Sequence, residues 1–235
     1  MGEHTVSSFD EELDHIDRLL REMSKLAAAM VHGAIAALTR GDKVLAQRVV
    51  SDDAVMDAHQ RELDDSAITL IAKRQPMALD LRMVVGAIRM AGDLERIGDL
   101  AKNIAKRVGA VAVNAAPVDS TRSIDDMAEL VIRQIGAVAA GYSERRPEGL
   151  ADLRADDERI DAKYTAVFRE LLTYMMEDPR NISTCAHLLF IAKNIERIGD
   201  HVTNIAENAY YMMTGQQLPP NRPKLDETSV TVPAA

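Results

Sequence analysis

Residues 93–103 read Asp93-Leu-Glu-Arg-Ile-Gly-Asp-Leu-Ala-Lys-Asn103, and residues 194–204 read Asn194-Ile-Glu-Arg-Ile-Gly-Asp-His-Val-Thr-Asn204. The five residues Glu-Arg-Ile-Gly-Asp are identical in the two copies, and the second copy follows the first by 101 positions. A repeat at such an offset predicts that the chain consists of two copies of one structural unit. In each copy the Glu and the Asp are four residues apart, so on a helix they lie on one face.

Apolar residues recur at three- and four-residue steps along most of the chain, which predicts long amphipathic helices. Glycine or proline separates the runs, at Gly41, Pro76, Pro117, Pro147 and Pro179. The expected helices cover about residues 9–38, 43–74, 78–113, 120–142, 147–176 and 181–213. Each copy of the motif falls on the third helix of its half.

This pattern predicts an all-α fold of two tandem three-helix bundles related by the internal repeat, because short turns join antiparallel neighbours. We expect the first bundle in residues 1–116 and the second in residues 117–214. Residues 215–235 are rich in proline and poor in apolar anchors. We predict that this tail is disordered.

The second expected helix shows which residues the pattern assigns to the core. Its apolar positions are spaced so that one face should pack against the rest of the bundle. The expected anchors are Val44, Leu45, Val49, Val55, Met56, Leu63, Ile68, Leu70 and Ile71.

Composition restricts the class of protein. The chain is 47% hydrophobic but only 3% aromatic, which favours helices over β-sandwiches. A net charge of −9 argues against a nucleic-acid binder, which needs a basic surface. The single cysteine, Cys185, excludes an intramolecular disulfide and a thiolate zinc site. No signal peptide and no apolar run long enough to span a bilayer is visible, so we expect a cytoplasmic protein without membrane insertion.

Acidic residues on the second expected helix match those of the first motif. If the second and third helices form an antiparallel hairpin about Pro76, residues equally far from the turn lie side by side. This count places Asp57 opposite Glu95. It also places Asp53 opposite Asp99, so four carboxylates should lie at one level of the hairpin.

The second half gives the same result from its own turn, at residues 178–179. Equal distances from that turn place Asp161 opposite Glu196 and Asp157 opposite Asp200. The spacing alone leaves open whether these rows face one another or solvent.

Clusters of carboxylate oxygens suit hard cations such as Mg²⁺, Mn²⁺, Ca²⁺ or iron. We therefore predict two metal-binding clusters, one in each half. The alternative is an ordinary solvated helix face, on which Arg96 and Arg197 neutralise the motif through surface ion pairs of little energy.

Residues beside the motif have two possible roles each. Gly98 and Gly199 cost about 1 kcal/mol each as mid-helix glycines, which close helix approach or access to a site would explain, although a tolerated defect would too. Asn103 and Asn204 either add a carbonyl ligand or cap the polar stripe. His201 is turned about 100° from the acidic face, and we expect it at the edge of the cluster rather than as a ligand.

The sequence argues against an enzyme. A ferritin-like di-iron oxidase needs paired Glu-x-x-His motifs, and the one Glu-x-x-His here is Glu12 to His15 on the first helix. No nucleophile–base arrangement and no glycine-rich phosphate loop is present. A non-enzymatic regulator that binds partner proteins is the leading hypothesis, and a metal-dependent hydrolase or a purely structural helical adaptor are the alternatives.

Three stretches carry a resemblance to a known family. They are the doubled Glu-Arg-Ile-Gly-Asp, the turn Ile71-Ala-Lys-Arg-Gln-Pro76 with the following Asp80-Leu-Arg82, and Leu172-Thr-Tyr-Met-Met-Glu-Asp-Pro179. With these motifs the chain resembles the PhoU family of phosphate-transport accessory proteins, over roughly residues 9–214. The tail after Gly215 has no counterpart in that resemblance.

The resemblance implies a cytoplasmic negative regulator of the phosphate-starvation (Pho) response that acts in phosphate homeostasis. It implies contacts with the ATPase of the phosphate ABC transporter (PstB-like) and with the phosphate sensor histidine kinase (PhoR-like), and a homodimer. It also implies bound metal ions or multinuclear iron clusters, with Mg, Mn, Zn or Fe as the open identities. The implied ligands are Glu95, Asp99, Glu196 and Asp200, faced by Asp53, Asp57, Asp157 and Asp161.

Overall fold

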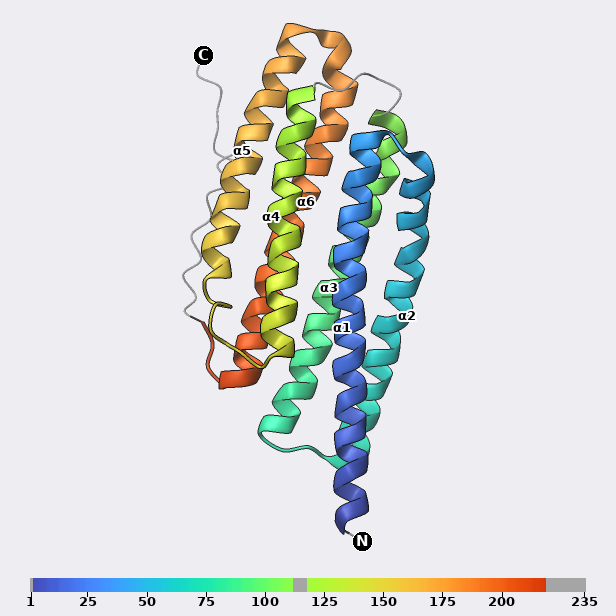
Figure 1. The fold of residues 1–235 in the computed structure, drawn as a ribbon, viewed down its shortest axis with the longest axis vertical. Coiled ribbons are helices and arrows are strands. Elements are labelled where there is room, and N and C mark those ends of the chain that lie inside the picture. The colour runs from blue at the N-terminus through green and yellow to red at the C-terminus, as the bar shows by residue number, and fades with distance from the viewer. Residues whose placement is uncertain (1, 112–117, 219–235) are drawn as a thin grey trace.

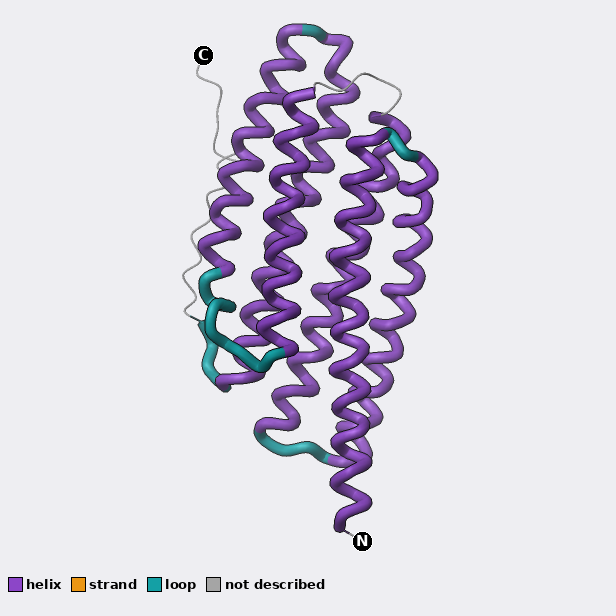
Figure 2. The backbone as a smooth tube through the Cα atoms, in the orientation of Figure 1, coloured by secondary structure: helices purple, strands orange, loops and turns teal. Residues whose placement is uncertain are grey.

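The computed structural model describes residues 2–111 and 118–218. These residues form long helices and no strand, so the predicted all-α class is confirmed (Figures 1 and 2). The predicted joint at Pro117 and most of the predicted disordered tail, residues 219–235, lie outside the described residues. The helices are α1 (Gly2–Arg40), α2 (Lys43–Arg74), α3 (Leu79–Val111), α4 (Val118–Ser143), α5 (Leu153–Glu177) and α6 (Ile182–Thr214), with a 3₁₀ turn η1 (Pro179–Asn181) before α6.

The helices form two three-helix bundles that stand side by side, as the repeat predicts (Figure 1). Helices α3 and α6, which carry the two motifs, pack along each other more extensively than any other pair, and α1 packs on α4. Helices α2 and α5 lie on the outside of the two bundles. The buried side chains of both halves therefore form one continuous hydrophobic core.

None of the helices in the described part of the chain is both long and apolar enough to cross a membrane.

The second helix begins at a regular N-cap. The Oδ1 atom of Asp42 accepts hydrogen bonds from the backbone N–H groups of Val44 and Leu45, both at 2.9 Å. Gly41 precedes it with a positive φ of 64°, a conformation that glycine adopts at little cost. These two residues reverse the chain between α1 and α2.

Only some of the predicted anchors of α2 are buried. Val44 is 82% exposed, and Val55 and Ile68 are also exposed, so the prediction was wrong for these three residues. The reason is that α2 touches only α1 and α3 among the described helices, so only one narrow face is covered. That face consists of residues seven positions apart, namely Val49, Met56, Leu63 and Leu70.

The fifth helix starts later than predicted. Its first residue is Leu153 rather than Pro147, because the chain first makes a turn in which Arg145 and Gly149 have positive φ values of 55° and 85°. Leu150 and Leu153 are buried and hold this turn against the bundle. The sequence pattern placed the break after the fourth helix correctly, but it did not show that the turn before α5 packs against the bundle.

The two bundles approach each other closely near one end. A Cβ atom at Gly86 on α3 would overlap the side chain of Met212 on α6. Nearby, Arg82 Nε donates a hydrogen bond to the carbonyl oxygen of Met212 at 3.2 Å, and its guanidinium lies 5.7 Å from the ring centre of Tyr211. These contacts fix α3 against α6 and so fix the relative position of the two motifs.

Candidate functional site

The first acidic cluster lies between α2 and α3, and a lysine joins its two helices. Lys102 Nζ lies 2.7 Å from Asp53 Oδ2 and 2.5 Å from Asp99 Oδ1. Partial burial lowers the pKa of Lys102, but the hydrogen bonds and charges of the two carboxylates outweigh it and raise the pKa above its usual value. The ammonium group therefore stays charged and reduces the repulsion between Asp53 and Asp99.

The other two carboxylates of the first cluster are Glu95 and Asp57. Burial raises the pKa of Glu95, and repulsion from Asp99, Asp57 and Asp53 raises it further, while Arg96 lowers it. The four carboxylates thus act on one another electrostatically, as residues at one level of a hairpin should. The Arg96 side chain is 62% exposed and lies 3.5 Å from both Glu95 and Asp99, so it is a weak partner.

The second cluster lies between α5 and α6 and is more deeply buried. Asp157, Asp161 and Glu196 are only 2%, 4% and 5% exposed. Asp200 is half-buried one turn further along α6. Asp161 and Asp200 lie near enough to Glu196 for their charges to raise its pKa, and Asp157 Oδ1 lies beside Gly199 of the motif.

Glu196 is the most unusual carboxylate of the second cluster. Its Oε1 atom lies 3.0 Å from Lys193 Nζ, but its Oε2 atom is buried and has no hydrogen-bond partner among the described residues. Burial raises the pKa of Glu196, the contact with Lys193 lowers it, and the charges of Asp200 and Asp161 raise it. A buried carboxylate oxygen without a partner is costly, so this atom is available for a cation or a proton.

The two motif glycines allow the hairpins to pack closely. A Cβ atom at Gly98 would lie 3.2 Å from Met56 Cγ. A Cβ atom at Gly199 would lie 3.0 Å from Ile160 Cδ1 and 3.3 Å from Asp157 Oδ1. Of the roles considered for these glycines, the structure thus favours close helix approach.

His201 links the two halves, which its place beside the acidic face did not suggest. Its Nδ1 atom lies 2.9 Å from Asp93 Oδ1 on α3, and Asn204 Nδ2 donates to the same oxygen at 3.4 Å. Asn204 thus bonds across the bundle interface, while Asn103 is exposed. His201 and Asn204 border a polar groove of about 910 Å³ between the halves, which Glu95 also lines.

The two lysines are the functional neighbours that sequence reasoning missed. Lys102 follows Asp99 by three residues, and Lys193 precedes Glu196 by three. On a helix this spacing places each lysine beside its carboxylate. The signal was therefore present in the sequence, but only the packing shows that Lys102 also reaches Asp53.

The arrangement of the acidic side chains determines how well they fit a metal ion. Among the described residues, no three carboxylate, histidine or cysteine side chains converge closely enough to hold one ion. The all-oxygen donor set suits hard cations, and the unpartnered Glu196 Oε2 fits a ligand. In the first cluster Lys102 already supplies a cation. The fit is therefore better in the second cluster, and the metal role of all eight carboxylates stays a prediction.

Comparisons with known proteins show which proteins this chain is similar to. The model of the PhoU domain matches twice, over residues 20–108 and 124–209. A phosphate-specific transport system accessory protein PhoU homolog of Rhizobium meliloti is 55% identical over 226 residues, which are 96% of this chain and 95% of the relative. A homolog of the same description from Caulobacter vibrioides is 47% identical, over 97% of this chain and all of the relative.

Two solved structures have the same fold as this chain. The crystal structure of PhoU from Pseudomonas aeruginosa superposes with a TM-score of 0.85 at 31% identity, and covers 88% of this chain and all of its own. The phosphate transport system regulatory protein PhoU of Streptococcus pneumoniae gives a TM-score of 0.81 at 25% identity, over 90% of this chain and 99% of its own. With two matching domains, full-length relatives and the same fold, this chain belongs to the PhoU family.

Proposed function

We propose that this chain is a cytoplasmic accessory regulator of phosphate uptake that restrains the phosphate-starvation response. In this proposal it contacts the ATPase of the phosphate ABC transporter and the phosphate sensor histidine kinase, and it works as a homodimer. The observation that carries the proposal is the end-to-end match, at 55% identity, with a relative named as a phosphate-specific transport system accessory protein. A regulator of this kind acts by binding and needs no catalytic step.

The proposal includes cation binding at the second cluster. Asp157, Asp161, Glu196 and Asp200 would hold a divalent metal ion or iron, which would supply positive charge where burial and mutual repulsion raise the pKa of Glu196. The unpartnered Oε2 atom of Glu196 favours this over a purely structural adaptor.

The first cluster would bind a cation under a further condition. Lys102 has to release Asp53 and Asp99 before those carboxylates, with Asp57 and Glu95, can act as ligands. Its ammonium group therefore competes with a metal ion at this position. We propose that the first cluster binds divalent cations more weakly than the second.

The regulatory role is tested by deleting the gene and measuring the activity of a phosphate-starvation reporter in phosphate-rich medium. The reporter should become active, and the wild-type gene should silence it again. Tagged protein should also retain the transporter ATPase and the sensor kinase in a pull-down with both purified proteins. An inactive reporter after deletion, with neither protein retained, would refute the role.

The enzymatic alternative has its own test. If the purified protein hydrolysed a phosphoester and Asp99→Ala abolished the turnover, a metal-dependent hydrolase would replace the proposal. Sedimentation at several protein concentrations tests the homodimer, which predicts twice the mass of the chain.

Cation binding is tested by thermal unfolding with Mn²⁺, Mg²⁺, Zn²⁺ or Fe²⁺ added in turn. At least one ion should raise the melting temperature of the wild type, because it binds the folded state only. Asp161→Asn should abolish the rise, whereas Glu158→Gln, a charge change on the same helix outside the cluster, should keep it. The absence of any rise with all four ions would refute cation binding without touching the regulatory role.

A further inference from the structure

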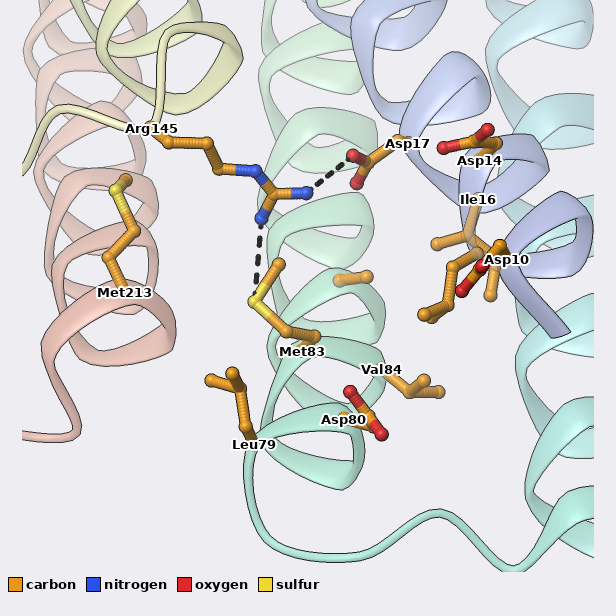
Figure 3. A pocket seen from close by; sticks show the side chains of 12 residues that line it. Asp10, Asp14, Ile16, Asp17, Leu79, Asp80, Met83, Val84, Arg145 and Met213 are labelled. Atoms are coloured by element: carbon orange, nitrogen blue, oxygen red, sulfur yellow. Dashed lines mark hydrogen bonds and ion pairs between the residues drawn. The ribbon is translucent and has the colours of Figure 1, made fainter. Parts of the chain in front are cut away.

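A second groove lies beside the close approach of Gly86 and Met212, and none of the eight cluster carboxylates lines it. It has a volume of about 510 Å³ and is formed by the start of α1, the start of α3, the end of α6 and the turn after α4 (Figure 3). Its floor is apolar and includes Leu13, Ile16, Leu79, Met83, Val84 and Met213. Leu79 is 51% exposed, so part of this floor is open to solvent.

One wall of the groove is a fixed polar contact. Arg145 reaches from the turn after α4 to Asp17 on α1, with Nη2 at 2.8 Å from Oδ2, and its Nη1 atom lies 3.5 Å from Met83 Sδ (Figure 3). The Tyr142 hydroxyl donates a hydrogen bond to the other oxygen of Asp17. The charge of Arg145, the cation that lines this groove, is therefore already balanced by Asp17.

The rim carries further negative charge. Asp10 and Asp14 come from α1, and Asp80 comes from the first turn of α3 (Figure 3). The side chains of these three residues form no ion pair with any residue in the part of the chain that the structure describes. An apolar floor thus lies beneath three carboxylates that form no ion pair with the described residues.

The turn that leads into the groove is held in an unusual conformation. Gln75 and Ala78 both have a φ of 49°, in the left-handed region that non-glycine residues rarely adopt. Residues in this conformation occur preferentially where a structure positions a binding or catalytic group. Here the turn positions the exposed Leu79 and the carboxylate of Asp80 at the mouth of the groove.

We propose that this groove binds a basic amphipathic segment of a partner protein. Apolar side chains of the segment occupy the floor, and its Lys or Arg side chains pair with Asp10, Asp14 and Asp80. A helix with one apolar face fits a hydrophobic groove in this way, and opposite charges at the rim set orientation and speed of association.

Other occupants fit the groove less well. The segment that follows α6 leads away from it, because Gln217 and Leu218 line the separate polar groove beside Arg89 and Arg96. A second copy of this chain carries a net charge of −9 and is repelled by an acidic rim. Anionic lipid headgroups are repelled for the same reason.

This inference is independent of the metal clusters, since none of their eight carboxylates lines the groove. It adds a docking surface of stated chemistry to the regulatory role. If the groove bound no such segment, the metal prediction would be unaffected, and if the clusters bound no metal, the proposal for the groove would be unaffected.

The test measures binding of a probe by fluorescence anisotropy. The probe is a fluorescein-labelled peptide of leucine and lysine, about 18 residues long and amphipathic as a helix. A peptide with the same composition in scrambled order is the control. The full chain should bind the ordered peptide, and the triple variant D10N/D14N/D80N should weaken binding at least about tenfold, because it removes the complementary charge.

Matched variants distinguish binding in the groove from general electrostatic attraction between the basic peptide and the acidic protein. The triple variant E22Q/E148Q/E158Q makes the same charge change at residues outside the groove and should alter the affinity less than about twofold. Leu79→Ala should weaken binding several-fold, whereas Val44→Ala, at an exposed apolar residue on α2, should not. Circular dichroism confirms that each variant is folded, and both leucine and valine changes lie at exposed positions.

Four results would overturn the inference. They are equal weakening by the two triple variants, equal binding of the scrambled peptide, and no binding of the ordered peptide at all. The fourth is evidence that the tail or a second copy of the chain occupies the groove. If truncation after Leu218 tightened binding tenfold, the tail would occupy the groove, and if D10N/D14N/D80N dissolved a dimer in sedimentation, a second copy would.

Discussion

The two acidic clusters contain the same motif but balance its charge differently. In the first, Lys102 bridges Asp53 and Asp99 across the hairpin. The equivalent position in the second repeat is Thr203, which is buried and whose hydroxyl oxygen has no hydrogen-bond partner among the described residues. There the lysine comes from the other side, as Lys193 beside Glu196.

The difference shows that the motif alone does not determine which cation contacts its carboxylates. A bridging ammonium holds Asp53 and Asp99 of the first cluster together, so the stability of this cluster should depend on Lys102. The second cluster buries three of its carboxylates deeply, and burial raises the pKa of Glu196, so its stability should depend on pH and on added cations. The following changes test these two statements, from the largest expected effect to the smallest.

Replacing Lys102 with Met should destabilise the protein most. The change leaves Asp53 and Asp99 facing each other without their cation, which costs on the order of 2 kcal/mol for a partly buried pair. The melting temperature should then fall by about 4–8 °C. Mn²⁺ or Mg²⁺ should restore more stability to this variant than to the wild type, because the competing ammonium is gone.

The control for this change is Lys106→Met, which removes an exposed lysine one turn further along α3. It should change the melting temperature by less than about 1 °C, as surface substitutions usually do. Equal melting temperatures of Lys102→Met and Lys106→Met would show that the bridge contributes nothing to stability.

Replacing Glu196 with Gln should raise the stability of the protein, whereas Lys102→Met should lower it. Burial and neighbouring charges raise the pKa of Glu196, so the folded protein binds this proton more tightly than the unfolded chain. The ionised group therefore costs stability above the raised pKa, and this cost disappears as the pH falls to the ordinary value of 4.5. Near pH 8, without metal, Gln should raise stability on the order of 1 kcal/mol.

The gain from Glu196→Gln should shrink as the pH is lowered and vanish below about pH 4.5. Thermal unfolding from pH 8 to pH 4.5, with chelator present, measures this dependence. Glu95→Gln is the comparison, and its gain should be smaller because the Glu95 side chain is less deeply buried than that of Glu196. A gain that grows toward acid pH would contradict the assigned direction of the pKa.

The motif glycines should give the smallest effects. Ala favours a helix over Gly by about 1 kcal/mol, and at Gly98 the nearest atom belongs to the flexible side chain of Met56, so Gly98→Ala should be neutral to stabilising. At Gly199 the new methyl group meets Ile160 and Asp157, so Gly199→Ala should be less stable than Gly98→Ala.

Gly136→Ala calibrates this comparison, because a Cβ atom there meets nothing within 4 Å. It should raise stability by roughly 0.5–1 kcal/mol, the intrinsic helix preference alone. Chemical unfolding of the three variants gives the ranking, and equal values for Gly98→Ala and Gly199→Ala would mean that the two hairpins pack equally tightly.

Much of the fold could be predicted because helix formation depends on nearby residues. Gly41 and Pro76 marked turns that the structure has, and α2 begins and ends at the predicted residues. The start of α5 was misplaced because Leu150 and Leu153 bind the turn to the bundle. Likewise, the apolar Val44 and Ile68 are exposed because none of the described helices covers that side of α2.

The sequence by itself determined the repeat, the two hairpins and the level at which their carboxylates meet. These features follow from helix periodicity and from counting outward from a turn, both of which are local. It also contained the spacing of Lys102 from Asp99, although not the reach of that lysine to the next helix.

Only the tertiary structure decided how the two halves use these residues. The contact of His201 with Asp93 and the apolar groove below Asp10, Asp14 and Asp80 depend on how α3 packs on α6 and α1. The Glu196 oxygen that has no partner among the described residues depends on how α5 packs on α6. That packing is set by close approaches such as Gly86 against Met212, between residues far apart in the chain. Helix periodicity fixes which face a residue occupies, but the neighbouring helix determines what that residue contacts.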